Sequence, residues 1–518
     1  MKILKSLFSI VPSLAGCLMS GGCSGPGMDV RPNVIYVFPD QMRNHAMAFW
    51  NEPGYKEHVR FTADPVHTPN LNRFARQSMV LSSAVSNCPV SSPHRGMLLT
   101  GMYPDGSGVT LNCNSDRPVS NLRADAVCIS DVMKGAGYQC AYIGKLHVDY
   151  PTPNDPQCPG RYVESRQPAW DAYTPPGRRH GFDYWYSYGT FDVHKRPHYW
   201  DTEGNRYDPG EWSPKHETDK VISYLKNENS IRDAARPFFM MISYNPPHGP
   251  YRSLDDCMEE DYALYQDQPP GRLLIRPNAD TTMSKAGSAP YYFASVTGVD
   301  REFGRILKTL EDLGLDRNTI VVFTSDHGET MCSHSLTDPK NSPYAESLNV
   351  PFLIRYPGRI TPGVDNLLLS SPDIMPTLLG LCGLAPHIPA GTEGTDYSRL
   401  FLGDELLRPQ GALYIRNVDG DKNPEGKVLS YIPEARGIKT EKYTMSLTVD
   451  PVTKRLKSSL LFDDVNDPYQ LVNLPLEDHP DVVQELAGLM ASLLRQANDP
   501  WYRTGMLKEM IPYEIMDN

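Results

Sequence analysis

Residues 86–104 gather side chains that could carry out nucleophilic chemistry. The segment reads SNCPVSSPHRGMLLTGMYP and places cysteine and serine nucleophiles, a histidine and an arginine before a short apolar run. Pro93 suits the first position of a helix and Ser92 its cap, so Ser91 would lie at the helix N-terminus. Free N–H groups make this end an anion site, and Arg95, one turn further on, could bind the same anion. The segment predicts a nucleophile beside an anion site, with a capped helix and an exposed arginine as the alternative.

Four short apolar runs alternate with helical patterns along the chain. The runs cover 33–38, 139–143, 238–244 and 319–324. Helical periodicity is found over 71–78, 129–136 and 295–313. Buried strands separated by helices are typical of an α/β fold with a mostly parallel sheet between two helical layers.

Polar groups follow each apolar run. They are Asp40 and Gln41 after the first, Lys145 and His147 after the second, His248 after the third, and Asp326 and His327 after the fourth. Ligands of parallel sheets bind beyond the carboxyl ends of the strands, so these groups should share one edge of the sheet. Each one alone also fits a structural role, such as a helix cap for Asp40. Together they indicate a catalytic centre.

Four of these side chains could bind a divalent cation. Asp40 and Asp326 supply carboxylate oxygens, whereas Gln41 supplies a carbonyl oxygen. His327 adds a nitrogen. This mixed set suits Ca²⁺, Mg²⁺ or Mn²⁺ better than a metal that prefers thiolates, and the histidine shifts the preference toward manganese.

The composition excludes one large class of partners. The chain has 518 residues and a formal net charge of -12 at pH 7. It is long enough for one large domain and a smaller companion. Because an acidic chain does not bind polyanions in general, we expect no nucleic-acid partner, and an anionic substrate would need a local positive site.

The N-terminus has the pattern of an export signal. Lys2 and Lys5 precede an apolar run, and the residues before Cys17 resemble a lipoprotein cleavage box, with Cys23 as a second lipid site. We expect an exported protein, periplasmic or attached to the outer membrane, with an ordinary secretory signal as the alternative. No later stretch approaches the roughly 20 apolar residues of a membrane span, so only a lipid anchor would touch the membrane.

The distribution of residue types along the chain predicts three parts. We expect the export signal at 1–23, a catalytic domain at 30–400 and a C-terminal α+β subdomain at 401–518. Alternating segments at 443–449 and 457–462 indicate antiparallel strands there, followed by a helix at 478–496. Residues 149–217 lack periodicity and should form loops that shape a substrate pocket.

The segment around Ser91 resembles the signature of type I sulfatases, which belong to the alkaline phosphatase superfamily. That signature is Cys or Ser, any residue, Pro, any residue, Arg, four further residues and Thr-Gly. Here SSPHR begins at Ser91 and is followed by Thr100-Gly101. Cys88 lacks this spacing, so the resemblance selects Ser91 as the residue that such enzymes oxidise to formylglycine. It also implies an alkaline phosphatase-like fold.

Further segments look like sulfatase segments in the order found in that family. They are 67–78, 137–147, 180–185, 325–329, 371–384 and 462–474. The metal pairs depart from the common pattern, because Pro39 stands where many sulfatases have a first aspartate and His327 replaces the commoner asparagine. These pairs are also similar to those of choline sulfatases and phosphonate monoester hydrolases. A phosphodiesterase or phosphonate monoester hydrolase is therefore the alternative activity, and an inactive glycan-binding lipoprotein is a second one.

The resemblance implies a mechanism for sulfate ester hydrolysis. Oxidised and hydrated Ser91 would attack sulfur, while Arg95, Lys145 and the cation match the negative charge. Lys340 joins these positive groups although the family spacing around it is stretched. His248, assisted by Lys340, would protonate the leaving oxygen, and His147 would take the proton that lets sulfate depart.

The resemblance also implies partners and a substrate class. We expect Ca²⁺ first, with Mn²⁺ or Mg²⁺ as alternatives, and a formylglycine-generating maturase of the anaerobic radical type, because the nucleophile is a serine. A sulfated carbohydrate or glycosaminoglycan fragment suits an exported enzyme. Basic side chains in the loop region could line its pocket or could be solvated; the candidates are Arg178, Arg179, His194 and Arg196.

Overall fold

The computed structural model of the protein describes residues 31–422 and 428–511. The described residues from Pro32 onward belong to one compact unit. The expected export signal and its lipid sites, Cys17 and Cys23, lie outside the described residues. Among the helices of the described residues, none is long and apolar enough to cross a membrane.

A ten-stranded sheet forms the centre of the described part of the chain. Its order is β10-β2-β9-β8-β1-β7-β3-β4-β5-β6. The strands are β1 (Asn33–Val37), β2 (Met79–Leu81), β3 (Gln139–Lys145), β4 (Tyr184–Tyr188), β5 (Tyr199–Trp200), β6 (Arg206–Tyr207), β7 (Phe238–Ser243), β8 (Thr319–Thr324), β9 (Phe352–Arg355) and β10 (Gly363–Asp365). The neighbours β8, β1, β7, β3 and β4 are parallel. The four predicted apolar runs correspond to β1, β3, β7 and β8, which lie at the centre of the ten-stranded sheet.

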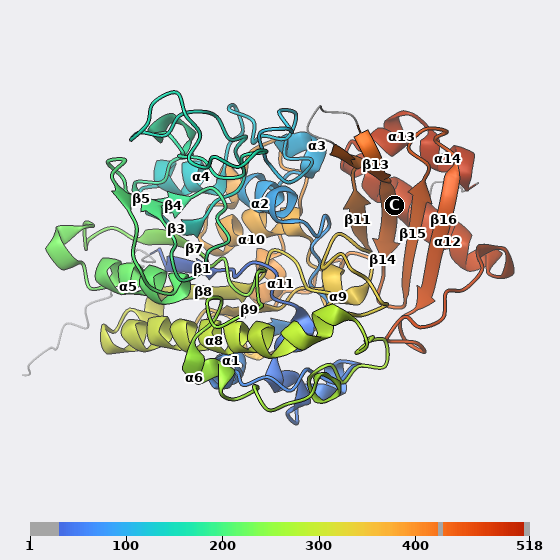
Figure 1. Ribbon diagram of the computed structural model, residues 1–518, viewed down its shortest axis with the longest axis horizontal. Helices are drawn as coiled ribbons and strands as arrows, with labels where there is room; N and C mark the ends of the chain where they lie inside the picture. Colours follow the sequence, from blue (N-terminus) through green and yellow to red (C-terminus); the bar gives the residue numbers. More distant parts are fainter. Residues whose placement is uncertain (1–30, 423–427, 512–518) are drawn as a thin grey trace, which may run out of the picture. The chain divides into compact units, whose positions relative to one another are not determined.

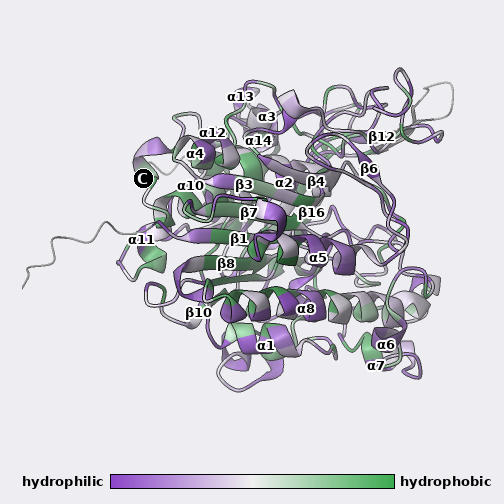
Figure 2. Ribbon diagram, turned by 90° about the vertical axis from the view of Figure 1, so that its left-hand side faces the viewer, coloured by the Kyte–Doolittle hydropathy of each residue, from purple (hydrophilic) through white to green (hydrophobic). Residues whose placement is uncertain are grey.

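Helices cover both faces of this sheet (Figure 1). One face carries α1 (Pro69–Ala75), α5 (Ser213–Leu225) and α8 (Ala289–Asp312), and the other carries α2 (Ser91–Thr100), α4 (Ile129–Gly135) and α10 (Ile374–Leu381). Alternate side chains of a strand face opposite ways. Ile35 and Val37 therefore pack with the first layer, and Val34 and Tyr36 with the second. Figure 2 shows the apolar strands between helices whose outer sides are hydrophilic.

Short helices connect the layers. They are α3 (Pro104–Ser107), α6 (Glu259–Tyr262), α7 (Pro270–Leu273), α9 (Ala345–Leu348) and α11 (Ser398–Phe401). Long stretches of 149–217 run outside helices and strands, as the lack of periodicity predicted. The predicted α/β architecture is confirmed.

The C-terminal region builds a smaller antiparallel sheet. Its order is β11 (Ala412–Arg416), β14 (Ala435–Lys439), β15 (Tyr443–Val449) and β16 (Leu456–Asp463). A separate hairpin pairs β12 (Asp419–Lys422) with β13 (Val428–Ile432). Three helices follow, namely α12 (Pro480–Gln496), α13 (Pro500–Arg503) and α14 (Met506–Met510). Met97 of α2 shares a core with Leu413 of β11 and Leu486 of α12, so the small sheet packs against the helix that carries Ser91.

Two predicted helix starts differ from the structure. Helix α2 begins at Ser91 with Val90 as its N-cap, so Ser92 is not the cap. The Ser92 hydroxyl instead accepts a hydrogen bond from the backbone N–H of Cys113 at 3.1 Å. Helix α8 begins at Ala289, before the expected position, because Pro290 is well placed in the first turn.

Candidate active site

The polar groups after the central strands meet at one edge of the sheet. Val37 lies opposite Ile242 of β7 and Phe323 of β8, so the three strands end side by side. Gly144 has φ of 99°, and a Cβ there would overlap the backbone of Ser243. Glycine at this position lets β3 deliver Lys145 close to β7.

Ser91 lies buried in the middle of this edge. Its hydroxyl donates to Asp40 Oδ1 at 3.3 Å and lies 3.1 Å from His327 Nε2. Lys340 Nζ lies 3.5 Å from the same oxygen. Ser91 is the first residue of α2, and the backbone N–H of the next residue, Ser92, donates to Asn112 Oδ1 at 3.0 Å. The structure thus brings the selected nucleophile together with the predicted metal ligands and with Lys340.

Three of the predicted metal ligands are close enough to hold one ion. Ligand atoms of Asp40, Asp326 and His327 all lie within 4.8 Å of one another and are buried. His327 Nδ1 donates to Gly328 O at 2.9 Å, so Nε2 is unprotonated and its lone pair is available to a metal ion. The side-chain oxygen of Gln41 is buried and has no hydrogen-bond partner among the described residues. Three anionic or neutral acceptors and an unsatisfied carbonyl oxygen fit a divalent cation.

Positive side chains hold the two carboxylates in place. Arg95 Nη2 lies 3.1 Å from Asp40 Oδ2 and 3.2 Å from Asp326 Oδ2, and Lys145 Nζ lies 2.8 Å from Asp40 Oδ2. Burial and the charge of Asp40 raise the pKa of Asp326 to about 7. Burial also acts to raise the pKa of Asp40, but Lys145 and other cations outweigh it and hold that pKa well below its usual range. A divalent cation would favour the ionised form of both carboxyls.

Arg95 is engaged by the protein rather than facing an open anion site. Besides the two carboxylates, its guanidinium donates to Ser243 Oγ at 2.6 Å and to Lys145 O at 2.9 Å. It is buried, with Phe38 packed against it at 4.9 Å. These contacts give Arg95 the geometry of a residue that positions the metal ligands.

His248 and Lys340 form a pair at the mouth of the site. His248 Nδ1 donates to Gly249 O at 2.7 Å, and its Nε2 lies 3.1 Å from Lys340 Nζ. Burial lowers the pKa of Lys340, although Asp40 acts in the opposite direction. A lysine with a lowered pKa beside an imidazole can pass a proton toward a leaving group.

His147 offers a neutral imidazole in the wall of the same cavity. Its Nε2 donates to Cys113 O at 3.1 Å, so Nδ1 carries the lone pair. That Nδ1 is buried without a partner in the described ranges. Burial, followed by the charges of Lys145 and Arg95, lowers the pKa of His147 well below its usual value. The lowered pKa keeps the ring neutral, so the unpartnered Nδ1 has a lone pair that can accept a proton from a substrate-side group.

A cavity of about 370 Å³ joins these residues. Ser91, Lys145, His147, His248 and Lys340 line it. It also has walls that the sequence analysis did not single out, namely Asn112, Glu164, Arg166, Trp170, Thr190, Phe191, Asp192 and Val193. A second cavity of about 180 Å³ adjoins it and shares Asn112, Trp170 and Lys340.

The four predicted substrate residues lie elsewhere. Within the described chain, Arg178, Arg179, His194 and Arg196 are absent from the walls of both cavities. Arg178 donates to Leu122 O at 2.7 Å, and Arg179 donates to Thr202 O at 2.7 Å. His194 supports the backbone of His248 with a 2.9 Å contact, and Arg196 is exposed. Arg166, from the same loop region, lines the larger cavity instead.

Asn245 is a further residue that the sequence analysis missed. Its carbonyl oxygen accepts from Lys145 Nζ at 3.1 Å, and its amide donates to Asp192 Oδ1 at 3.1 Å. Its place two residues after β7 is the signal that could have found it, because every central strand is followed by site residues.

Comparisons with known proteins agree with this geometry. Residues 32–384 match the family model described as sulfatase, and residues 333–497 match one described as N-sulphoglucosamine sulphohydrolase, C-terminal. An endo-4-O-sulfatase of Bacteroides thetaiotaomicron is 63% identical over 498 residues, which cover 95% of this chain and 98% of the relative. An ulvan-active sulfatase of Formosa agariphila is 32% identical, covering 94% of this chain and 88% of the relative.

A solved structure extends the likeness to three dimensions. It comes from work on the metabolism of multiple glycosaminoglycans by Bacteroides thetaiotaomicron and is 64% identical to this chain. The alignment has a TM-score of 0.91 and covers 93% of this chain and all of the other.

Proposed function

We propose that this chain, which belongs to the sulfatase family and is a sulfuric ester hydrolase, removes 4-O-sulfate groups from within a sulfated glycan chain. The observation that carries this proposal is the position of Ser91 at a helix N-terminus, with Asp40, His327 and Lys340 within 3.5 Å of its hydroxyl. A sulfate group placed there meets a nucleophile, a cation site and a proton donor together.

The substrate class is supported by the relatives and by the shape of the cleft. The relative of 63% identity is named an endo-4-O-sulfatase. Its action inside a polymer requires room for sugar units on both sides of the reacting one. The two adjoining cavities together offer such room. Asn112, Trp170 and Lys340 line both of them. Arg166 at the larger cavity can pair with an acidic group of the glycan.

Each positive side chain has a position suited to sulfate. Lys145 and Lys340 line the cavity and can donate to sulfate oxygens, while Asn245 holds Lys145 in place. Charge that develops on these oxygens is stabilised by groups already fixed before reaction, so no reorganisation is needed. Arg95 fixes Asp40 and Asp326 and does not need to touch the substrate.

Two proton-transfer groups flank the nucleophile. His248 Nε2, next to Lys340 Nζ, can protonate the leaving sugar oxygen, and the free Nδ1 of His147 can accept a proton when sulfate departs. A bound divalent cation, held by Asp40, Asp326, His327 and Gln41, would polarise the sulfate and lower the pKa of the attacking oxygen. We propose Ca²⁺ for this site.

Maturation of Ser91 to formylglycine is part of the proposal. A serine sulfate ester has no second hydroxyl to expel its sulfate, so unmodified serine would stop after one turnover. The maturase is proposed to be of the anaerobic radical type, which acts on serine. Export and a lipid anchor at Cys17 or Cys23 are proposed from the N-terminal pattern, because sulfated glycans are met outside the cytoplasm.

Sulfate release tests the activity directly. Matured protein should release sulfate from a 4-O-sulfated glycosaminoglycan, and a Ser91→Ala variant should not. Aryl phosphate diesters, assayed beside aryl sulfates, should be the poorer substrates, because the named relatives are sulfatases. A preference for phosphate diesters would overturn the proposed function.

A further inference from the structure

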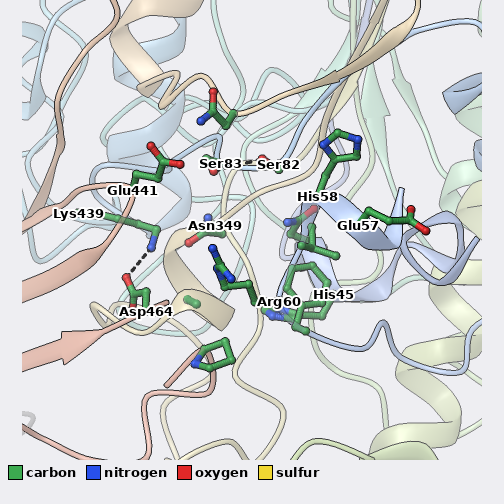
Figure 3. Close-up of a pocket in the computed structure, with 16 residues that line it drawn as sticks. His45, Glu57, His58, Arg60, Ser82, Ser83, Asn349, Lys439, Glu441 and Asp464 are labelled. Carbon is green, nitrogen blue, oxygen red and sulfur yellow. Dashed lines mark hydrogen bonds and ion pairs between the residues drawn. The ribbon is translucent and has the colours of Figure 1, made fainter. Parts of the chain in front are cut away.

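The segment that follows β1 reaches two separate places in the structure. Its later part lines a cavity of about 250 Å³ opposite Lys439 and Asp464 of the C-terminal region (Figure 3). Acidic side chains outnumber the lysine and arginine side chains in its walls, so this cavity offers an anion no net positive site. The first residues of the segment, Asp40 and Gln41, enter the active site instead, where the side chain of Gln41 meets a buried carboxylate.

That carboxylate belongs to Glu329, which the proposed mechanism does not use. Glu329 is fully buried. Its Oε2 accepts from Gln41 Nε2 and, at 2.8 Å, from the hydroxyl of Tyr251. Its Oε1 accepts at 2.8 Å from Lys285 Nζ and at 2.8 Å from the backbone N–H of Met331. Each oxygen therefore has two donors, which together fix the orientation of the carboxylate.

The contact with Glu329 determines which end of the Gln41 amide is free. Only the nitrogen of an amide can donate to a carboxylate, so the oxygen is left on the other side. That oxygen, Oε1, is buried and has no hydrogen-bond partner among residues 31–422 and 428–511. The backbone is fixed as well. Gln41 has φ of 65°, which is uncommon for a residue other than glycine, and its N–H donates to Asp326 Oδ1 at 3.0 Å while its carbonyl accepts from Tyr292 at 3.0 Å.

The free amide oxygen belongs to the group of atoms that would hold the divalent cation. The backbone contact places Gln41 beside Asp326, and ligand atoms of Asp326, Asp40 and His327 lie within 4.8 Å of one another. An ion touches its ligand atoms directly, so buried atoms suit an ion although a larger ligand could not reach them. Ser91, in contact with Asp40 and His327, connects these atoms to the cavity of about 370 Å³.

We propose that Glu329 is a positioning residue, which holds the Gln41 amide so that its oxygen is presented to the divalent cation. The inference rests on the cation of the proposed function. Outer partners of this kind orient the ligands of metal sites, and their loss typically weakens metal binding about tenfold to a hundredfold. Glu329 also explains why an amide stands at position 41, because a second carboxylate there would face that of Glu329 with no donor between them.

A pair of substitutions exploits the difference between a carboxylate and an amide. In Glu329→Gln, the new NH2 group cannot face Lys285 and the Met331 N–H, because both are donors, so it must face Gln41. The Gln41 amide then turns its oxygen toward this NH2 group and away from the ion. Adding Gln41→Glu exchanges the carboxylate and the amide without changing the net charge, and it provides an oxygen on both sides. Tyr251→Phe is the matched control, because it removes another hydrogen bond from the same oxygen of Glu329 and keeps the Gln41 contact.

Calorimetric titration of the full unmatured chain with Ca²⁺, and separately with Mn²⁺, measures ion affinity without turnover. Glu329→Gln should weaken binding about tenfold to a hundredfold. The double variant should return to the wild-type affinity, and Tyr251→Phe should keep it. The rise in melting temperature that the ion causes should follow the same order, because a ligand stabilises the folded chain according to its affinity.

A merely structural role for Glu329 predicts a different pattern. Glu329→Gln would then lower the melting temperature without ion, as Tyr251→Phe does, and leave the ion affinity unchanged. Equal affinity of wild type and Glu329→Gln for both ions would overturn the inference and leave the proposed function intact. A double variant as weak as Glu329→Gln alone would also overturn it.

The titration also separates failure of the two proposals. Because no substrate is present, matured protein that released no sulfate would refute the proposed function, while the ion affinities would still decide the role of Glu329. Wild type that bound neither ion would overturn the inference together with the proposed cation.

Discussion

Replacing His248 by glutamine should slow hydrolysis of a glycan sulfate far more than hydrolysis of an aryl sulfate. The contact from Nδ1 to Gly249 O turns Nε2 toward Lys340 and the cavity. A sugar alkoxide is a strong base and must gain a proton as it leaves, whereas a nitrophenolate can leave without one. Loss of the general acid should therefore depend on the leaving group.

The size of the effect follows from the role. General acid catalysis contributes about a hundredfold to ten-thousandfold, which equals about 3 to 5 kcal/mol of transition-state stabilisation. We expect a loss of this size on a sulfated disaccharide and a loss of less than about tenfold on nitrophenyl sulfate. The side chain of His248 is 18% exposed and lies at the mouth of the cavity, so the melting temperature should change little.

Steady-state assays of matured protein with both substrates check this reasoning. His67→Gln is a matched control, because His67 is an exposed histidine that does not line the active-site cavity. It should behave as wild type on both substrates. Equal losses on the sugar and aryl sulfates would show that His248 acts in binding, and the assignment of the general acid would be wrong.

Three further predictions concern maturation, the metal and the buried carboxyls. Mass spectrometry of the peptide with Ser91 should show loss of two hydrogens only after coexpression with the maturase, in step with activity; full activity of the unmodified protein would exclude formylglycine. Asp326→Ala should abolish turnover and weaken binding of divalent ions in calorimetry while the fold remains, and unchanged metal content and rate would remove Asp326 from the site. Burial raises the pKa of Asp373 to about 7, above the value near 4 of an unfolded chain, so folding stability should fall as pH rises between these values. Denaturant unfolding of Asp373→Asn should show a weaker fall over this range, and an unchanged profile would contradict the assignment.

The sequence predicted the central strands and the chemistry that follows them for a physical reason. A strand buried on both faces must be apolar throughout. The residues that follow its carboxyl end lie at the edge of the sheet where ligands bind. Asp40, Lys145, His248 and Asp326 are therefore recognisable from position alone. The sulfatase resemblance is confirmed, while the catalytic roles of these residues stay predictions.

Loop residues followed no such rule. Arg166 and Trp170 lie in 149–217, which contains several arginines and aromatic residues. Because this region lacks helical or strand periodicity, the sequence does not indicate which of them line the cavity. Arg178 and Arg179 turn instead to backbone carbonyls, which sequence cannot distinguish from solvent or substrate.

The charge balance of the site explains how an acidic protein can bind an anionic substrate. The chain carries -12, yet three positive side chains lie close to Ser91, namely Arg95, Lys145 and Lys340, and the first two hold the carboxylates Asp40 and Asp326. Because Arg95 and Lys145 are buried, solvent screens their charges poorly and these charges act strongly on a sulfate. A divalent cation would add further positive charge beside Ser91. The acidic surface then disfavours anions everywhere except at such local sites, so placement rather than net charge selects the substrate.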